Sequence, residues 1–216
     1  MNIRNWFKMF IKTLLVGGVV TILTGLLIQW VENGFSFSGF TFVELLIVML
    51  WYFGMGLLFS VISQMGYLAY LMVHRLGLSF FRSVWNPIQV GLIAFALFDL
   101  VYFRYTIFAT EGEGIFSYFL VALLLLLAGV LIAYIKTKQV GKSSVFIPAL
   151  FFMVVISIIE WFPALRLNDP VWLHLMIYPL FACNAYQLLV LPRYIEQSKQ
   201  ERMMKKGRQE VLTNKN

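Results

Sequence analysis

Long apolar stretches without charged side chains run through this sequence, and they constrain its fold more than any other feature. Short polar segments separate these stretches, which is the pattern of a chain whose solvent is lipid rather than water. Only 12% of the residues are charged, against roughly a quarter in soluble globular proteins. So few charges cannot cover a water-exposed surface. We therefore expect an all-α integral membrane protein.

Six segments are long enough to cross a bilayer, because a ~30 Å hydrocarbon core requires roughly 20 residues of helix. Each segment should be helical, since lipid offers no hydrogen-bond partner to an unpaired backbone group. The sequence therefore predicts a single domain over residues 1–192, a bundle of about six transmembrane helices, and a basic cytoplasmic tail at 193–216. The predicted spans are about 13–30, 45–73, 83–103, 115–135, 145–163 and 171–192.

Basic residues are distributed unequally between the two sides of these spans. Fifteen of the 17 Lys and Arg residues lie in the N-terminal segment, the second and fourth loops and the tail. The other three loops hold only Arg104 and Arg166, together with the acidic residues Glu32, Glu44, Glu111, Glu113 and Asp169. Cations near a membrane are retained in the cytoplasm. We expect a plasma-membrane protein with both termini cytoplasmic, whose basic tail can also contact anionic lipid.

The net charge of +7 does not indicate nucleic-acid binding, because the basic residues lie between apolar runs rather than in a patch. The sequence lacks a zinc-protease His-Glu-x-x-His motif, a Gly-x-Ser-x-Gly nucleophile elbow and phosphate- or dinucleotide-binding glycine motifs. Its single cysteine, Cys183, cannot form an internal disulfide. We expect no enzymatic activity, no metal and no cofactor.

Two ionisable side chains within the predicted spans, Asp99 and Glu160, form a candidate outer polar cluster with three residues of the adjoining loops. Placing a charge at the bilayer centre costs roughly 2.5–3.5 kcal/mol, so such residues need partners or a function. The cluster, near the predicted outer membrane surface, comprises Asp99, Arg104, Glu160, Arg166 and Asp169. Ion pairs that hold helices in register are one interpretation. A sensing or ion-binding cluster and a proton pathway are the others.

Uncharged polar residues occupy the inner half of several spans and are candidates for interhelical contacts: Gln64, Asn86, Gln89, Asn184 and Gln187. Hydrogen bonds between such side chains specify helix packing. A polar cavity is the alternative. Small residues at four-residue spacing, Gly17, Thr21 and Gly25, should let the first span pack closely within the bundle.

Several segments carry a resemblance to a known family: 59–66, 74–77, 98–105, 146–152, 160–161, 167–170 and 183–189. In these segments the sequence resembles the KbaA family, activators of the KinB signalling pathway in spore-forming bacteria. The resemblance covers most of the chain from the second span onward and departs mainly in the longer, more basic tail. It implies a multi-pass membrane protein that activates a membrane histidine kinase feeding the sporulation phosphorelay, and it supplies no catalytic residue.

Two classes of function follow from the sequence. The first is a membrane accessory protein that regulates a histidine kinase, its partner by resemblance, through helix contacts or sensing. The second is a small secondary transporter or channel of unknown substrate. A transporter is usually built from repeats, and the first three spans share neither glycine placement nor polar positions with the last three. This comparison favours the accessory protein.

Overall fold

The computed structural model describes residues 3–32, 41–109 and 114–213, with side chains as far as Lys205. Within these ranges the chain is almost wholly helical and contains no β-strand. The α-helices are α1 (Ile3–Glu32), α2 (Phe42–Phe81), α3 (Trp85–Phe108), α4 (Phe116–Val140), α5 (Phe146–Phe151), α6 (Ser157–Leu167) and α7 (Pro170–Thr213). Shorter segments connect some of them: the 3-10 helices η1 (Arg82–Val84) and η2 (Ser143–Val145), and the π-helix η3 (Phe152–Ile156).

The helices begin and end at residues suited to those positions. At the start of α2, the Glu44 carboxylate accepts a hydrogen bond from the Thr41 backbone N–H at 2.8 Å, which is part of a capping box. Helix α4 ends at Gly141, whose φ of 71° suits glycine. Arg82, with φ 46°, and Asn168, with φ 50°, turn the chain after α2 and α6. Glu111 and Glu113, predicted in an outer loop, lie outside the described residues.

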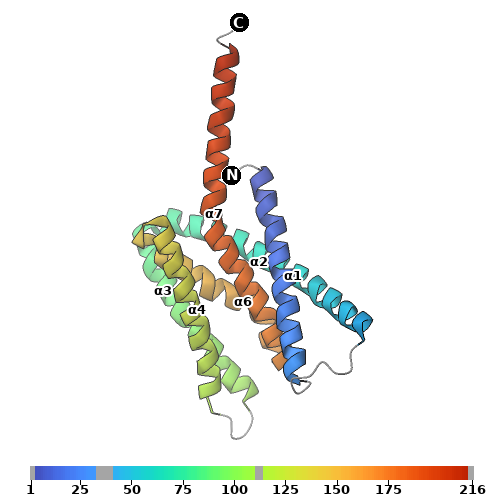
Figure 1. The fold of residues 1–216 in the computed structure, drawn as a ribbon. Helices are drawn as coiled ribbons and strands as arrows, with labels where there is room; N and C mark the ends of the chain where they lie inside the picture. The colour runs from blue at the N-terminus through green and yellow to red at the C-terminus, as the bar shows by residue number, and fades with distance from the viewer. Residues whose placement is uncertain (1–2, 33–40, 110–113, 214–216) are drawn as a thin grey trace.

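The helices form one elongated bundle, from which α7 projects (Figure 1). The start of α1, the α2–α3 junction at η1, the α4–α5 junction at η2 and the projecting end of α7 lie toward the same end. The other end holds the last turns of α1 and α3 and the start of α7. Helix α1 packs along α2 and α7, and α6 packs along α7. The segments predicted to be cytoplasmic are therefore at one end of the bundle.

Five helical stretches of the described chain are long and apolar enough to cross a membrane: Ile3–Glu32, Phe42–Phe108, Phe116–Val140, Ser143–Leu167 and Pro170–Lys205. The predicted all-α fold is confirmed for this part of the chain. The second stretch contains two predicted segments, 45–73 and 83–103, because η1 joins α2 to α3 without a non-helical gap. Helix α7 also continues past residue 192, so no helix end separates the last predicted span from the tail.

Apolar side chains cover the outside of the bundle, while polar ones lie within it. Leu50, Trp51 and Phe116 are 71%, 63% and 72% exposed, whereas Ser63 and Asn184 are fully buried. Soluble proteins rarely expose large apolar patches and bury polar side chains only when these are paired. The distribution is compatible with a hydrocarbon environment around the helices.

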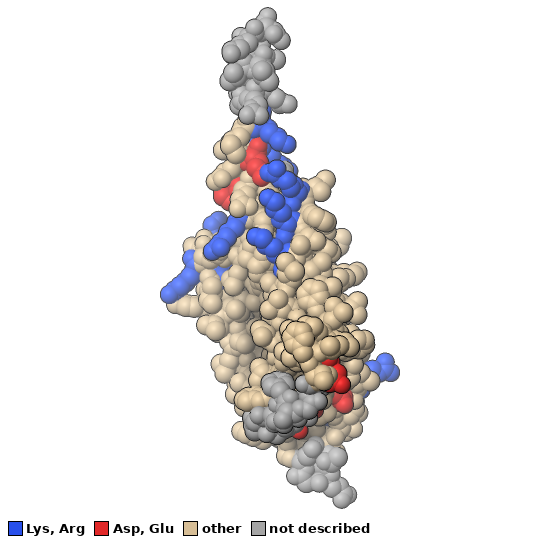
Figure 2. All heavy atoms as spheres, turned by 45° about the vertical axis from the view of Figure 1, so that its right-hand side comes forward, with Lys and Arg blue, Asp and Glu red and all other residues tan. Residues whose placement is uncertain are grey.

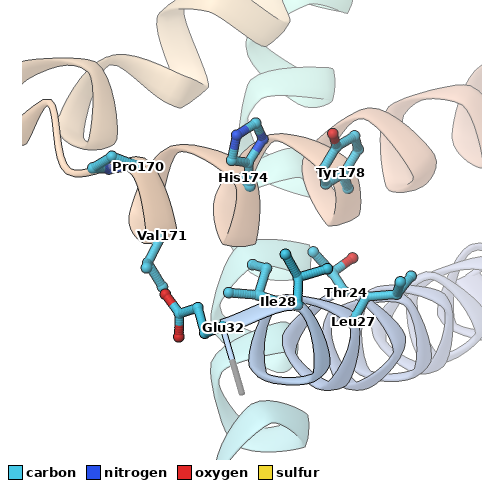
Figure 3. Close-up of a pocket in the computed structure, with 9 residues that line it drawn as sticks. Thr24, Leu27, Ile28, Glu32, Pro170, Val171, His174 and Tyr178 are labelled. Carbon is cyan, nitrogen blue, oxygen red and sulfur yellow. The ribbon is translucent and has the colours of Figure 1, made fainter. Parts of the chain in front are cut away.

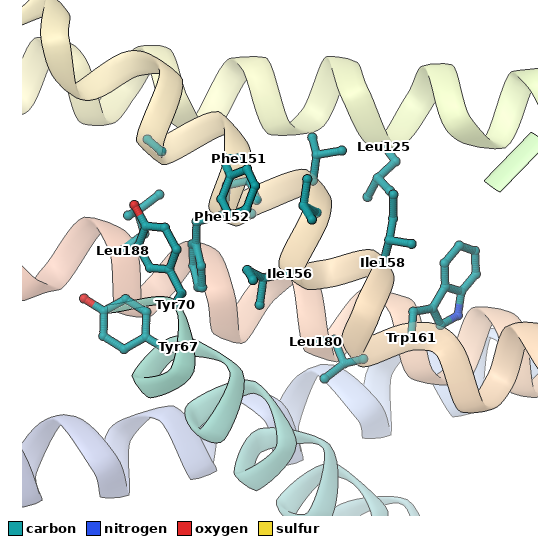
Figure 4. Close-up of a cluster of buried hydrophobic side chains, with 14 of the residues drawn as sticks. Tyr67, Tyr70, Leu125, Phe151, Phe152, Ile156, Ile158, Trp161, Leu180 and Leu188 are labelled. Atoms are coloured by element: carbon teal, nitrogen blue, oxygen red, sulfur yellow. The ribbon is translucent and has the colours of Figure 1, made fainter. Parts of the chain in front are cut away.

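The centre of the apolar core surrounds η3 (Figure 4). Every residue from 151 to 158 is buried, which requires neighbours on all sides of this segment. The Tyr70 ring lies 4.9 Å from the Phe152 ring, and the Tyr70 hydroxyl donates to the Pro148 carbonyl at 3.0 Å. A π-turn contains about one more residue than an α-turn. Segment η3 therefore rotates the side chains of α6 relative to those of an unbroken α-helix.

Glycines allow the backbones of α1 and α2 to approach closely. A methyl group on Gly56 would lie 2.6 Å from Oγ1 of Thr21 and 2.7 Å from the Cα atom of Gly18, both on α1. Gly17 and Gly25 likewise face α2, since a methyl group on either would meet atoms of that helix. The small-residue face predicted in the first span therefore packs within the bundle.

We predict that Gly56→Leu lowers the thermal stability of the purified protein in detergent, because the new side chain has no space at the α1–α2 contact. Overpacking of this kind costs about 1–3 kcal/mol. Gly54→Leu is the matched control on the same helix, because a Cβ atom at Gly54 meets nothing within 4 Å. Equal unfolding temperatures for the two variants would contradict this account of the contact.

Candidate functional site

Polar side chains from three helices meet inside the apolar bundle, and we call them the central polar network. Each helix contributes two of them at a spacing of three residues, which places both on one helix face. All are at most 6% exposed. The network comprises Ser60 and Ser63 of α2, Ser157 and Glu160 of α6, and Asn184 and Gln187 of α7.

Asn184 is the centre of this network. Its Oδ1 accepts a hydrogen bond from Ser63 Oγ at 2.7 Å, and its Nδ2 donates to Ser157 Oγ at 3.0 Å and to Glu160 Oε2 at 2.7 Å. Gln187 adds a second bond to α2, because its Nε2 donates to Ser63 Oγ at 2.7 Å. One side chain of α7 therefore ties together α2, α6 and α7.

Ser60 and Cys183 extend these contacts to α1. Ser60 Oγ lies 2.8 Å from the Gly56 carbonyl oxygen and 3.2 Å from that of Thr13 on α1. Cys183 Sγ lies 3.6 Å from the same Thr13 oxygen. These weak, fully buried contacts need small side chains, so Cys183 serves here as a packing residue between α1 and α7.

Glu160, predicted to lie in the outer polar cluster, belongs to the central polar network. The predicted fifth span ended at residue 163, but α6 continues to Leu167, so Glu160 is roughly 10 Å from that helix end. Its Oε1 has no hydrogen-bond partner in the described part of the chain and lies close to Gly66 of α2. The carboxylate fits there because Gly66 has no side chain.

Arg104, another member of the predicted cluster, contacts neutral groups. Its Nη2 donates to Asn168 Oδ1 at 2.8 Å, and its guanidinium carbon lies 5.3 Å from the centre of the Tyr118 ring. Its Nε has no hydrogen-bond partner among the described residues. Arg104 is half-buried and keeps an unused donor.

The remaining members of the predicted cluster do not come together as ion pairs. Asp169 accepts a hydrogen bond from the Trp172 backbone N–H at 3.0 Å and so caps the start of α7. Arg166 is exposed and Asp99 is half-buried. Over the described ranges, none of the five residues of the predicted cluster takes part in an ion pair. The described residues therefore do not show the ion pairs that were one interpretation of this cluster, since Asp169 caps a helix and Glu160 hydrogen-bonds Asn184.

Three predicted interhelical contact residues lie outside the network. Gln64 and Gln89 are buried, but Gln64 Nε2 and both amide atoms of Gln89 lack a hydrogen-bond partner in the residues described. Asn86 is half-buried. The predicted interhelical bonds are therefore present for Asn184 and Gln187 but not for these three residues.

Lys136 was counted from the sequence as a loop cation, but α4 continues to Val140 and carries Lys136 into the bundle, where it is 6% exposed. Its Nζ donates to the carbonyl oxygen of Leu188. That carbonyl would accept from residue 192 in a regular helix, but Pro192 has no N–H to donate. Lys136 thus supplies the donor that Pro192 lacks.

Further contacts tie α1 to α7 where α7 leaves the bundle. Asn5 Nδ2 donates to Ser198 Oγ at 3.0 Å in a buried contact, and Arg4 forms an ion pair with Glu201 at 2.5 Å. Both contacts join residues far apart in the sequence. They fix the base of the projecting segment of α7 against the start of α1.

Open grooves with mainly apolar linings lie between the helices. One, of about 610 Å³, separates α1 from the first turns of α7. In Figure 3, Thr24, Leu27 and Ile28 of α1 lie across this groove from His174 and Tyr178 of α7. A second, of about 590 Å³, lies between α4 and α7, and a third, of about 630 Å³, lies between α1, α2 and α7 at the basic end. Such grooves can hold lipid chains or partner helices.

The chain is similar to a known protein family and to one of its characterised members. The KbaA family, described as KinB-signalling pathway activation in sporulation, matches residues 17–194. The KinB-signaling pathway activation protein of Bacillus subtilis (strain 168) is 44% identical over 196 residues, which cover 90% of this chain and 98% of that protein. No solved structure matches the chain.

We predict that Asn184→Leu lowers the free energy of unfolding by roughly 2 kcal/mol, because three interhelical hydrogen bonds at about 0.6 kcal/mol each are lost. Thermal unfolding of the purified protein in detergent measures the change. Asn86→Leu is the control, because it replaces the same residue type at a half-buried position whose side chain makes no hydrogen bond to the described residues. A variant at Asn184 as stable as the control would show that the network does not hold the helices together.

Proposed function

The chain belongs to the KbaA family, and on this premise we propose that it is a multi-pass membrane protein that activates a membrane histidine kinase feeding the sporulation phosphorelay. The family match over residues 17–194 carries the proposal, because it covers the bundle from the middle of α1 onward and stops before the projecting end of α7. In this proposal the bundle acts on the kinase and performs no catalytic step of its own.

Six membrane crossings with cytoplasmic termini are part of the proposal. Helices α2 and α3 would cross the membrane separately. Two observations support this: the positive φ of Arg82 between them, and their different directions in Figure 1. Figure 2 shows Lys and Arg gathered toward the end from which α7 projects. Retention of those cations in the cytoplasm would orient the bundle.

Contact with the kinase would use the exposed apolar faces of the bundle. In lipid, helices associate through close packing and hydrogen bonds rather than through exclusion of water. The central polar network fixes α7 against α2 and α6, so it determines the surface that those helices present. Within the predicted cluster, Glu160 is the member that hydrogen-bonds Asn184 of α7. If the predicted cluster senses a signal, we propose that the signal reaches α7 through Glu160 rather than through Asp99 or Arg166.

A small secondary transporter or channel is the second candidate function. One observation favours it: among the described residues, Oε1 of Glu160 in the central polar network has no hydrogen-bond partner. Ionisable residues inside membranes often mark ion or proton pathways. Proteoliposomes containing the chain would then show ion- or substrate-dependent uptake that Glu160→Gln abolishes. A kinase activator would show no such uptake.

The orientation predicts which positions a membrane-impermeant maleimide can reach in intact cells. In a Cys183→Ser background, a cysteine at Gly114 should be labelled from outside, because this position precedes α4 at the end away from the projecting segment. A cysteine at Ser144, in η2 at the opposite end, should be labelled only after permeabilisation. Labelling of both positions in intact cells would refute the proposed orientation.

Complementation tests the regulatory function. Expression of this chain in a Bacillus subtilis strain that lacks the 44% identical relative should restore sporulation, and the tagged chain should co-purify with the kinase and increase its autophosphorylation. A chain truncated after Lys205 should act equally well, because the family match ends at residue 194.

Asn184→Leu should weaken this activation at unchanged protein level, since it releases α7 from α2 and α6. Asn86→Leu should not. A chain present at normal level that neither co-purifies with the kinase nor changes its autophosphorylation would overturn the proposal.

A further inference from the structure

The groove between α4 and α7 combines a long apolar wall with one cation. Its volume of about 590 Å³ is within the range of about 300–1,000 Å³ typical of small-molecule sites. Val121 and Ala128 of α4 both line it, as do Leu173 and Ala182 of α7, so it extends about 10–14 Å along the helices. This shape suits a hydrocarbon chain lying parallel to the helix axes.

Arg104 lines the same groove close to the end of α3. Its described contacts are with Asn168 and the Tyr118 ring, both neutral. Its Nε lacks a partner among the described residues but is buried, so a ligand in the groove would meet the terminal guanidinium nitrogens. Asp99 is five residues earlier on α3, about 140° around the helix, so it faces away from Arg104. The guanidinium is therefore fixed in position without an acidic partner among the described residues.

An arginine with free donors binds phosphate oxygens well, because its planar N–H groups match their geometry. Arg104 is at the predicted outer membrane surface, while Ala128 and Phe181, further along α4 and α7, line the deeper part of the groove. The charge is thus at headgroup level and the apolar wall at the level of the lipid chains. This is the order of groups along a membrane phospholipid.

We propose that the α4–α7 groove is a binding site for an anionic phospholipid of the outer leaflet, with its headgroup phosphate on Arg104 and one acyl chain along α4 and α7. The inference rests on the proposed membrane orientation. A lipid bound there would contact α7 directly, on the helix that carries Asn184.

Photo-crosslinking in liposomes tests the site with the full-length protein. The probes are phosphatidylglycerol and phosphatidylcholine with the same diazirine-labelled acyl chain, and mass spectrometry identifies the labelled peptides. Phosphatidylglycerol should label the α4 and α7 peptides of the groove about fivefold more than phosphatidylcholine, the ratio expected from one cation near a membrane surface. Arg104→Gln should remove this preference, while Arg166→Gln, a change at a nearby exposed cation, should retain it.

Ala128→Phe provides a second variant that fills the groove and leaves Arg104 in place, so it should reduce labelling by both lipids. Equal labelling by the two lipids, an Arg104→Gln variant that keeps the preference, or full competition by soluble glycerol phosphate would each overturn the proposal. Alkaline extraction of the same liposomes separates the two inferences. A chain released by alkali contradicts membrane insertion, whereas a chain that stays inserted without lipid preference contradicts only this site.

Discussion

Asn184, a polar side chain buried among apolar helices, finds its hydrogen-bond partners on two neighbouring helices and so joins three helices together. Its amide accepts from Ser63 of α2 and donates to Ser157 and Glu160 of α6. Apolar contacts alone would allow helices in lipid to slide or rotate, because lipid chains compete equally well for apolar surfaces. Asn184 therefore contributes more to the rotation and depth of α7 against α2 and α6 than an apolar side chain could.

Backbone groups in the bundle follow the same rule. Pro192 deprives the Leu188 carbonyl of its usual donor, and Lys136 reaches it from α4. The contact stabilises the middle of α7, next to Gln187 of the central polar network. Lys136, predicted from the sequence to lie in a loop, is thus a buried contact residue between α4 and α7. The long helix α7 is held at its centre by side-chain amides and Lys136, and near its projecting end by Asn5 and Arg4.

The candidate site was only partly predictable from the sequence. Asn184 and Gln187 were identified as interhelical contacts because polar side chains in an apolar run need partners. Gln64 and Gln89 were chosen for the same reason. In the described chain, however, Gln64 Nε2 and both amide atoms of Gln89 have no hydrogen-bond partner. The contact between Glu160 and Asn184 could not be predicted, because the depth of Glu160 depends on where α6 ends and its direction depends on η3. The spacing of three residues shared by the polar pairs of α2, α6 and α7 was the available signal for the network.

The sequence by itself determined that the chain is helical and apolar on its outside, because run length and charge content do not depend on how the helices pack. It also determined which segments carry the cations and which family the chain resembles. Only the tertiary structure decided that α7 continues past residue 192, that Lys136 is buried and that Glu160 joins Asn184. The reason is that hydrophobicity acts residue by residue, whereas hydrogen bonds between helices require two distant side chains at the same depth and facing one another.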